Sequence, residues 1–178
     1  MIFTKTKLEG AYIIDIEKRE DDRGFFARTF CVDEFEEHGI ENKFVQANMS
    51  FNNKKGTLRG MHFQKSPYEE DKLVRCTKGA LFDVIIDLRK DSPTYKQWIG
   101  VELTEESRRA LFVPKGFAHG YITLEDNTEI NYMVTQVYTP NADTGVRYND
   151  PVFAIEWPIE PVIISEKDAN HPNFEEIK

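Results

Sequence analysis

Three polar side chains occupy a strand-like stretch, residues 56–64 (GTLRGMHFQ), that otherwise consists mostly of apolar residues and glycine. Arg59, His62 and Gln64 could bind a ligand or transfer protons if they face one pocket. Strict strand alternation sets Arg59 and His62 on opposite faces, so a shared pocket requires a bulge or twist at Gly60. A lone histidine in such a strand is more often a hydrogen-bonded core residue, so the interpretation needs a second signal.

The second signal is residues 114–119 (PKGFAH), which match the P-x-G-x-x-H element in the second half of cupin barrels. In metal-binding cupins the first half supplies H-x-H and a nearby glutamate. This chain has HFQ at 62–64, followed by Glu69 and Glu70. Glutamine is a poor ligand for zinc or iron beside imidazole and carboxylate. The sequence therefore predicts a cupin pocket that works without a metal or another cofactor.

Short apolar or alternating runs separated by turn residues make up most of the chain, which is typical of a sandwich or barrel. In the clearest run, 80–88, apolar residues are interrupted only by Asp83 and Asp87. So many strands predict an all-β fold that closes into a cupin-type double-stranded β-helix, or jelly-roll barrel, with short peripheral helices. We expect strands at 11–16, 44–51, 57–64, 72–77, 80–88, 98–103, 110–113, 120–124 and 128–135.

One short helix is expected near the start of the chain. Asp33 is its expected cap, Glu36 completes a capping box, and Gly39 ends it.

Prolines recur in the C-terminal part, which we expect to wrap the barrel as extended segments and turns rather than as a helix. These prolines are Pro151, Pro158, Pro161 and Pro172.

The length of 178 residues fits one domain, and we expect residues 1–178 to form it. A net charge of −8 argues against a nucleic-acid partner, because such binding depends on clustered Lys and Arg. Cys31 and Cys76 lack the spacing of a zinc site or a disulfide framework, which fits thiols in a reducing cytosol. Residues 1–20 do not resemble a signal peptide, and no run is long enough to cross a membrane. We therefore expect a cytoplasmic protein without a membrane partner.

A longer series of motifs runs through the chain with a characteristic order and spacing. The motifs are DRGFF (22–26), QAN (46–48), LRGMHFQ (58–64), KLVR (72–75), FDV (82–84), DLR (87–89), SP (92–93), PKGFAHG (114–120), Tyr132, Tyr138, NDP (149–151), WP (157–158) and SEKD (165–168). Through them the chain resembles the dTDP-4-dehydrorhamnose 3,5-epimerase family over almost its full length.

The resemblance implies a nucleotide-linked 4-keto sugar as substrate. Its ketone acidifies the hydrogens on C3 and C5, because loss of either proton places charge on oxygen as an enolate. Inversion then needs a base on one face of the ring, a proton donor on the other and a polar group beside the oxygen. By resemblance His62 is the base, and Asp168 binds its other nitrogen. Tyr132 matches the proton donor, and Lys72 matches the group that faces the enolate oxygen.

Family positions that bind the nucleotide and its diphosphate are matched by Arg23 and Arg59, whose guanidinium forks suit phosphate oxygens. Tyr138 matches a base-stacking aromatic residue. Further ligand-contacting positions are matched by Gln46, Asn48, His119, Asp143 and Lys167. One substrate-contacting position departs from the family, since many members have glutamate in F-F-x-E-x-F where this chain has Arg28. This departure bears on the identity of the sugar or nucleotide.

The resemblance also implies a homodimer that exchanges strands near the N-terminus. Three functions remain open. The first is a 3,5-epimerase that converts dTDP-4-dehydro-6-deoxy-D-glucose to dTDP-4-dehydro-L-rhamnose. The second inverts only C3 or only C5 of a related nucleotide-linked deoxysugar, and the third is a cupin that binds a sugar nucleotide without turnover. The joint presence of His62, Tyr132 and Asp168 favours an enzyme, because binding alone has no use for an opposed base and acid.

Overall fold

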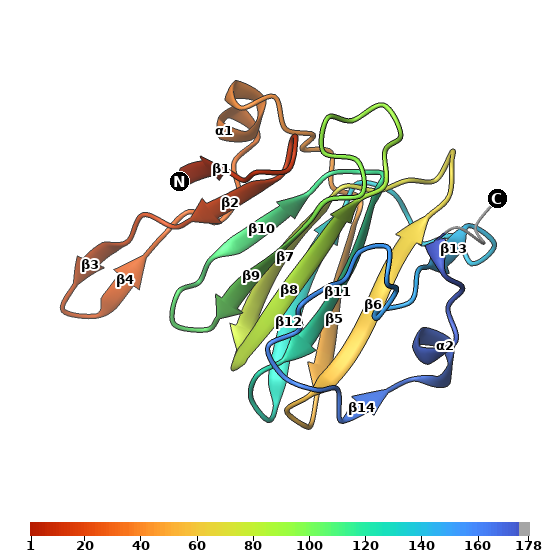
Figure 1. Ribbon diagram of the computed structural model, residues 1–178. Helices are drawn as coiled ribbons and strands as arrows, with labels where there is room; N and C mark the ends of the chain where they lie inside the picture. Colours follow the sequence, from red (N-terminus) through yellow and green to blue (C-terminus); the bar gives the residue numbers. More distant parts are fainter. Residues whose placement is uncertain (175–178) are drawn as a thin grey trace.

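The computed structural model describes residues 1–174 and consists mainly of antiparallel strands (Figure 1). One sheet has the order β1-β2-β10-β7-β12-β5, and the second has the order β13-β6-β11-β8-β9, with β14 parallel to β6. β3 and β4 form a separate hairpin. The strands are β1 (Ile2–Lys5), β2 (Tyr12–Asp15), β3 (Arg19–Asp21), β4 (Gly24–Phe26), β5 (Gln46–Asn52), β6 (Thr57–Gln64), β7 (Lys72–Lys78), β8 (Ala80–Asp87), β9 (Trp98–Thr104), β10 (Ala110–Val113), β11 (Phe117–Thr123), β12 (Thr128–Val134), β13 (Asp143–Gly145) and β14 (Ile163–Ile164); the helices are α1 (Val32–Glu37) and α2 (Glu166–Ala169).

The two sheets share an apolar core, because the apolar side chains on one face of each sheet point toward the other sheet. The core cluster takes Val74, Leu111 and Ile130 from the first sheet and Leu81, Ile85 and Leu103 from the second. The predicted all-β class is confirmed, and β6 and β10 have the predicted bounds. β11 begins earlier than predicted, at Phe117, because Gly116 with φ of 82° already completes the preceding turn.

The outer face of the first sheet is covered by the N-terminal segment and α1. Phe35 of α1 is fully buried and packs in one cluster with Ile14, Leu73 and Phe112. Burial of this aromatic side chain holds the six-residue helix in place, since so short a helix is not stable alone.

The predicted cap of α1 at Asp33 is wrong. Cys31 is the N-cap residue with an extended backbone, and no side chain caps the helix. Asp33 instead lies in the first turn, where its carboxylate faces the positive end of the helix dipole. Gly39 follows the C-cap residue with φ of 67°, so the predicted end of the helix is confirmed.

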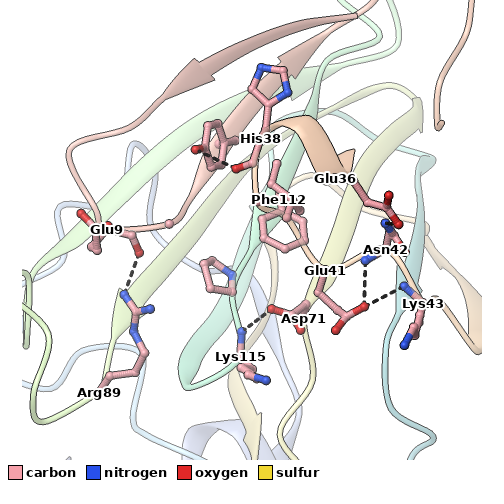
Figure 2. A pocket seen from close by; sticks show the side chains of 15 residues that line it. Glu9, Glu36, His38, Glu41, Asn42, Lys43, Asp71, Arg89, Phe112 and Lys115 are labelled. Carbon is pink, nitrogen blue, oxygen red and sulfur yellow. Dashed lines mark hydrogen bonds between the residues drawn. The ribbon is translucent and has the colours of Figure 1, made fainter. Parts of the chain in front are cut away.

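An open cavity of about 720 Å³ lies beside α1, β10 and the turn before β7 (Figure 2). Glu41 accepts hydrogen bonds from the amides of Asn42 and Lys43, and Asp71 accepts one from the amide of Lys115. Charges of both signs therefore offset one another along the lining, which includes Glu9, Glu36, Glu41, Asp71, Lys43, Arg89 and Lys115.

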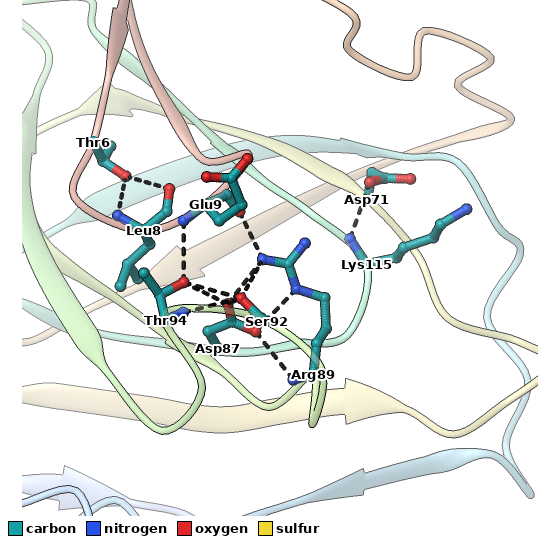
Figure 3. A network of polar contacts seen from close by, with 9 residues as sticks. All are labelled: Thr6, Leu8, Glu9, Asp71, Asp87, Arg89, Ser92, Thr94 and Lys115. Carbon is teal, nitrogen blue, oxygen red and sulfur yellow. Dashed lines mark hydrogen bonds and ion pairs between the residues drawn. The ribbon is translucent and has the colours of Figure 1, made fainter.

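A buried carboxylate anchors the end of β8 (Figure 3). Asp87 is fully buried, and Arg89 binds its two oxygens at 2.9 and 2.8 Å. The hydroxyls of Ser92 and Thr94 donate to Oδ2 at 2.5 and 2.7 Å. Burial works to raise the pKa of Asp87, but these donors outweigh burial and hold the pKa below its ordinary value. The DLR and SP motifs therefore fix the connection between β8 and β9.

The C-terminal part wraps the outer face of the second sheet. Val146 and Phe153 are buried against Met61, Val84 and Ala118 of that sheet. The expectation that this part contains no helix is wrong at α2, because the Ser165 hydroxyl caps a single helical turn by accepting the Asp168 amide at 3.1 Å.

The β3–β4 hairpin projects away from the barrel (Figure 1). At its tip and along its second strand, the side chain of Arg23 is 89% exposed and Phe26 is 69% exposed. Among the described residues, no helix has the length and apolar character needed to cross a membrane.

Candidate active site

Two adjoining cavities of about 280 Å³ each open between the sheets. Both are lined by His62 from β6, Lys72 from β7 and Tyr132 from β12. β6 belongs to the second sheet, whereas β7 and β12 belong to the first. The imidazole therefore enters the shared space from one sheet, and the ammonium and phenol enter it from the other.

Arg59 and His62 line the same cavity, although they are three positions apart on one strand. The pairing of β6 with β11 is irregular opposite this stretch, between His119 and Tyr121. Gly60 has φ of 129°, and a Cβ there would lie 2.5 Å from the Cα of Gly120. The predicted irregularity at Gly60 is confirmed, and it brings both side chains to one face.

His62 is paired with a buried carboxylate from α2. Its Nε2 lies 2.7 Å from Oδ1 of Asp168, and Oδ2 of Asp168 accepts the Gly60 amide at 3.2 Å. Because a carboxylate only accepts, Nε2 carries the hydrogen and Nδ1 is the nitrogen free to take a proton. Burial works to raise the pKa of Asp168, but the nearby rings of His171 and His62 and the Gly60 amide outweigh burial and lower the pKa. Asp168 is therefore anionic at neutral pH.

Tyr132 packs against the core beside the cavity and keeps its phenol toward the pocket lining. Burial, followed by the nearby Tyr121 and Glu70, raises the pKa of Tyr132, while Arg59 acts in the opposite direction. The phenol is therefore protonated at neutral pH and can serve as a proton donor.

Lys72 is buried and forms an ion pair with Glu70, which also lines one of the cavities. Although Lys72 is the first residue of β7, its side chain is therefore not exposed to solvent.

Gln64 is 4% exposed and binds Glu70 together with the backbone at Tyr68, Val137 and Thr139. Its amide holds the end of β6 against these loops. Glu70, which the sequence suggested only at the place of the glutamate of metal-binding cupins, lines the site beside Lys72.

A second histidine–carboxylate pair lies next to the first. His119 faces His62 across the β6–β11 ladder, and its Nε2 lies 2.7 Å from Oδ1 of Asp83. Asp83 is fully buried, and its Oδ2 has no hydrogen-bond partner among the described residues. The run of apolar residues around Asp83 had suggested only a core strand.

Around the predicted Arg59, the first cavity has polar neighbours that the sequence did not indicate. Arg59 Nε donates to Oδ1 of Asn52 at 2.9 Å, and the hydroxyls of Tyr121 and Ser50 lie 2.9 Å apart. Burial raises the pKa of Tyr121, against the effect of its hydrogen bonds to Ser50 and Asn52. Ser50 and Asn52 occupy alternate positions of β5 whose side chains point into the barrel. In the sequence alone, such polar residues are indistinguishable from surface residues.

Four residues predicted to contact the ligand line the second cavity: Gln46, Asn48, Tyr138 and Asp143. Gln46 donates to Asn48 at 2.9 Å and accepts the Tyr138 amide at 3.1 Å. The Tyr138 hydroxyl donates to Asp143 at 3.2 Å, and Lys167 forms an ion pair with the same carboxylate. The structure thus brings most of the predicted binding residues together.

Arg23 and Arg28 lie outside both cavities of their own chain. Arg23 pairs with Asp21 in the exposed β3–β4 hairpin at 2.6 Å. Arg28 pairs with Glu34 of α1 at 2.6 Å, and Glu34 also binds the N-terminal amino group. The two arginines predicted to contact substrate are therefore not joined to the site within one chain.

His62, Asp168 and His171 form a compact cluster whose nitrogen and oxygen atoms lie within 4.8 Å of one another. Two ligands on a tetrahedral zinc ion, each about 2 Å from the metal, lie about 3.3 Å apart. The 2.7 Å between His62 and Asp168 is instead a hydrogen-bond distance. The cluster is therefore arranged as a hydrogen-bonded dyad with a third ring beside it.

The cavity in Figure 2 is lined by none of the predicted site residues.

Comparison with known proteins gives consistent matches over nearly the whole chain. A family model described as dTDP-4-dehydrorhamnose 3,5-epimerase matches residues 5–176. The chain is 48% identical to the dTDP-4-dehydrorhamnose 3,5-epimerase of Methanothermobacter thermautotrophicus over 94% of this chain and 91% of the relative. It is 39% identical to the dTDP-4-dehydrorhamnose 3-epimerase of Streptomyces niveus over 92% of this chain and 79% of that relative.

The fold matches as closely. The crystal structure of dTDP-6-deoxy-D-glucose-3,5-epimerase from Legionella pneumophila in complex with dTDP-4-keto-L-rhamnose has a TM-score of 0.93 and 40% sequence identity. The match covers 99% of this chain and 94% of that chain. The predicted cupin-type jelly-roll barrel is thereby confirmed.

Proposed function

The chain belongs to the dTDP-4-dehydrorhamnose 3,5-epimerase family, and we propose that it inverts C3 and C5 of dTDP-4-dehydro-6-deoxy-D-glucose to give dTDP-4-dehydro-L-rhamnose. The observation that carries the proposal is the shared lining of the two cavities. His62 and Tyr132 enter them from opposite sheets, which suits a base and an acid acting on opposite faces of one sugar ring.

Each inversion proceeds by one proton removal and one proton return. Nδ1 of His62 takes the proton from C3 or C5, and the electron pair of the broken C–H bond moves onto the C4 oxygen as an enolate. The Lys72 ammonium faces this oxygen, where a preorganised donor contributes about 3 to 4 kcal/mol of transition-state stabilisation. Tyr132 then donates its phenolic proton to the opposite face of the carbon. Exchange with solvent restores the protonation of both side chains.

Solvent deuterium incorporation tests this function. Turnover of dTDP-4-dehydro-6-deoxy-D-glucose in D₂O is expected to place deuterium at both C3 and C5 of the product, as measured by NMR and mass spectrometry. His62→Ala is expected to remove incorporation at both carbons while circular dichroism shows a native fold. Native incorporation by this variant, or none by the unmodified protein, would contradict the proposal.

A single-carbon epimerase is the second candidate, because the relative from Streptomyces niveus is a 3-epimerase. The same base and acid serve both reactions. Deuterium at C3 alone, with C5 keeping its original hydrogen, would identify this activity in the same experiment.

We also propose that the protein acts as a homodimer in which Arg23 completes the site of the partner. Arg23 lies on a projecting hairpin with the exposed side chains of Phe25 and Phe26, at 42% and 69%. On the outer face of β5, Met49 and Phe51 are also exposed, at 64% and 45%. Both apolar surfaces fit a second copy of this chain, and one guanidinium fork per site then reaches the diphosphate.

Mixed dimers test this arrangement. Arg23→Ala paired with His62→Ala leaves one complete site if Arg23 acts in the partner, so about half of the native activity is expected. The reciprocal dimer, a native chain paired with the Arg23→Ala, His62→Ala double variant, then contains no complete site. If Arg23 acts in its own chain, the two activities are reversed. A solution mass of one chain would contradict the dimer itself.

A cytoplasmic location completes the proposal. Cys31 and Cys76 are both free, and burial raises the pKa of the Cys76 thiol to about 11. Such thiols fit a reducing compartment.

A further inference from the structure

His171 lies against the dyad, although the proposed reaction assigns it no role. Its ring meets the ring of His62 edge to face, with centroids 5.5 Å apart and planes at 76°. Its Nε2 is 3.6 Å from Oδ1 of Asp168, the oxygen that also contacts His62. Two imidazoles thus approach one carboxylate oxygen from different sides.

The surrounding chain fixes the His171 ring in this position. The residue is 6% exposed, and its carbonyl oxygen accepts a hydrogen bond from Arg147 Nε at 3.2 Å. A Cβ on Gly145 would lie 2.6 Å from Nε2 of His171, so β13 passes directly beside the ring. Burial and this close approach leave the ring little room to turn away from Asp168.

The charges around the ring make Asp168 its natural partner. Nε2 of His171 is buried and makes no hydrogen bond among the described residues, so the carboxylate is the anion that it faces. Lys167 of α2 forms an ion pair with Asp143 of β13, and the guanidinium of Arg147 donates to the His171 carbonyl oxygen rather than to its ring. A buried carboxylate is costly unless donors surround it. The close His171 ring contributes to the lowered pKa of Asp168, against burial, which acts in the other direction.

We propose that His171 is a positioning residue that holds Asp168 anionic and correctly oriented, and thereby fixes the hydrogen of His62 on Nε2. The Gly60 amide binds one carboxylate oxygen and His62 binds the other, while the buried His171 ring lies 3.6 Å from that second oxygen. The ring thereby limits rotation of the carboxylate plane, and Nδ1 of His62 stays free to accept a proton. The effect on turnover rests on the proposed function, whereas the effect on the His62 tautomer does not.

Two substitutions separate the donor from the ring. His171→Phe keeps a planar ring but removes the N–H group, and His171→Gln places an amide N–H near the position of Nε2. His38→Asn is the matched control, because His38 stacks on Phe3 at the surface, away from both cavities. Thermal unfolding of each variant establishes that the measurements are made on folded protein.

The tautomer of His62 is read from the ¹⁵N chemical shifts of its ring in the free protein, and kcat and KM are read from turnover. His171→Phe is expected to mix the two tautomers and to lower kcat about tenfold with little change in KM. His171→Gln is expected to restore a single tautomer and most of kcat. A native tautomer and kcat in His171→Phe, or equal losses in both variants, would overturn the inference. If the two variants change the His62 tautomer as expected but the unmodified protein shows no turnover, only the proposed function is contradicted.

Discussion

His62 and Asp168 are 106 residues apart in sequence yet share a hydrogen bond of 2.7 Å. The hydrogen bond matters because it decides which ring nitrogen is free. With Nε2 donating to the carboxylate, the proposed base is Nδ1, and the imidazolium that it would form is stabilised by the adjacent charge. The proposed acid, Tyr132, is kept protonated chiefly by burial. The two local environments therefore suit the two opposite proton-transfer roles that we propose.

Replacing Asp168 with Asn tests the dyad at the residue scale. An amide at this position can donate to His62 and so stabilise the wrong tautomer, and kcat is expected to fall about 10²- to 10⁴-fold. Glu166→Gln is the control, because Glu166 is exposed in the same helix. Steady-state kinetics with folded protein make the comparison, and a native kcat in Asp168→Asn would contradict the assigned role.

We expect the ionisation of Asp87 to make the free energy of unfolding depend on pH. Its pKa in the folded protein lies below the unfolded value of about 3.9, so the folded state binds the proton less readily. The stabilisation is complete above the unfolded pKa and is lost as the pH falls through the folded pKa. Between pH 6 and pH 3, the free energy of unfolding is therefore expected to fall more in the native protein than in Asp87→Asn.

Urea unfolding at each pH measures this difference. Asp91→Asn, an exposed carboxylate in the same loop, provides the control and should behave as the native protein. At neutral pH, Asp87→Asn is expected to lose about 3 to 5 kcal/mol, because it breaks a buried ion pair. Equal pH slopes in Asp87→Asn and the native protein would remove Asp87 as a source of acid sensitivity.

At the scale of elements, the apolar pattern predicted the nine expected strands, with β6 and β10 at their observed bounds. It missed β1, β3 and β4, whose residues are almost all exposed, so that none of these strands shows the alternation of a half-buried strand. It also missed β13 and β14, which are short and exist through pairing with distant β6. Long-range pairing leaves no local signal, and therefore these elements could not be read from the sequence.

Gly60 is the element-scale feature on which the site depends. Gly60→Ala would place a Cβ 2.5 Å from Gly120 Cα and force β6 and β11 apart. We expect a loss of about 2 to 4 kcal/mol in unfolding free energy and a large loss of activity, because Arg59 and His62 would no longer share one face. Gly24→Ala is the matched control: Gly24 has a similar φ of 123°, but nothing lies within 4 Å of its added Cβ. Equal stability losses in the two variants would contradict the role of close packing.

At the scale of the whole molecule, the family motifs predicted that His62, Lys72 and Tyr132 would meet, and they line the same cavities. The FDV motif (82–84) includes Asp83 but gave it no role, and none of the motifs includes His171. Asp83 lies within an apolar strand, and His171 lies in a C-terminal segment without periodicity, so each gains its histidine or carboxylate partner only through folding.

The proposed dimer makes a prediction of its own. Phe51→Lys places a charge on the exposed outer face of β5 and should raise the dissociation constant of the dimer at least tenfold, or about 1.4 kcal/mol. Glu102→Lys on the exposed side of β9 makes a charge change on the other sheet and should leave the dimer intact. Sedimentation over a concentration series compares the two variants, and an unchanged dissociation constant in Phe51→Lys would exclude this face from the interface.

If a base and an acid act on opposite faces of one sugar ring, Tyr132→Phe should separate proton exchange from inversion. The measurement is the ratio of deuterium exchange to inversion at C3 and C5 in D₂O. Without the phenol, His62 still removes protons and returns deuterons to the face from which they came. We therefore expect substrate that gains deuterium but keeps its configuration. Exchange and inversion falling together, with their ratio unchanged, would contradict the placement of His62 and Tyr132 on opposite faces of the ring.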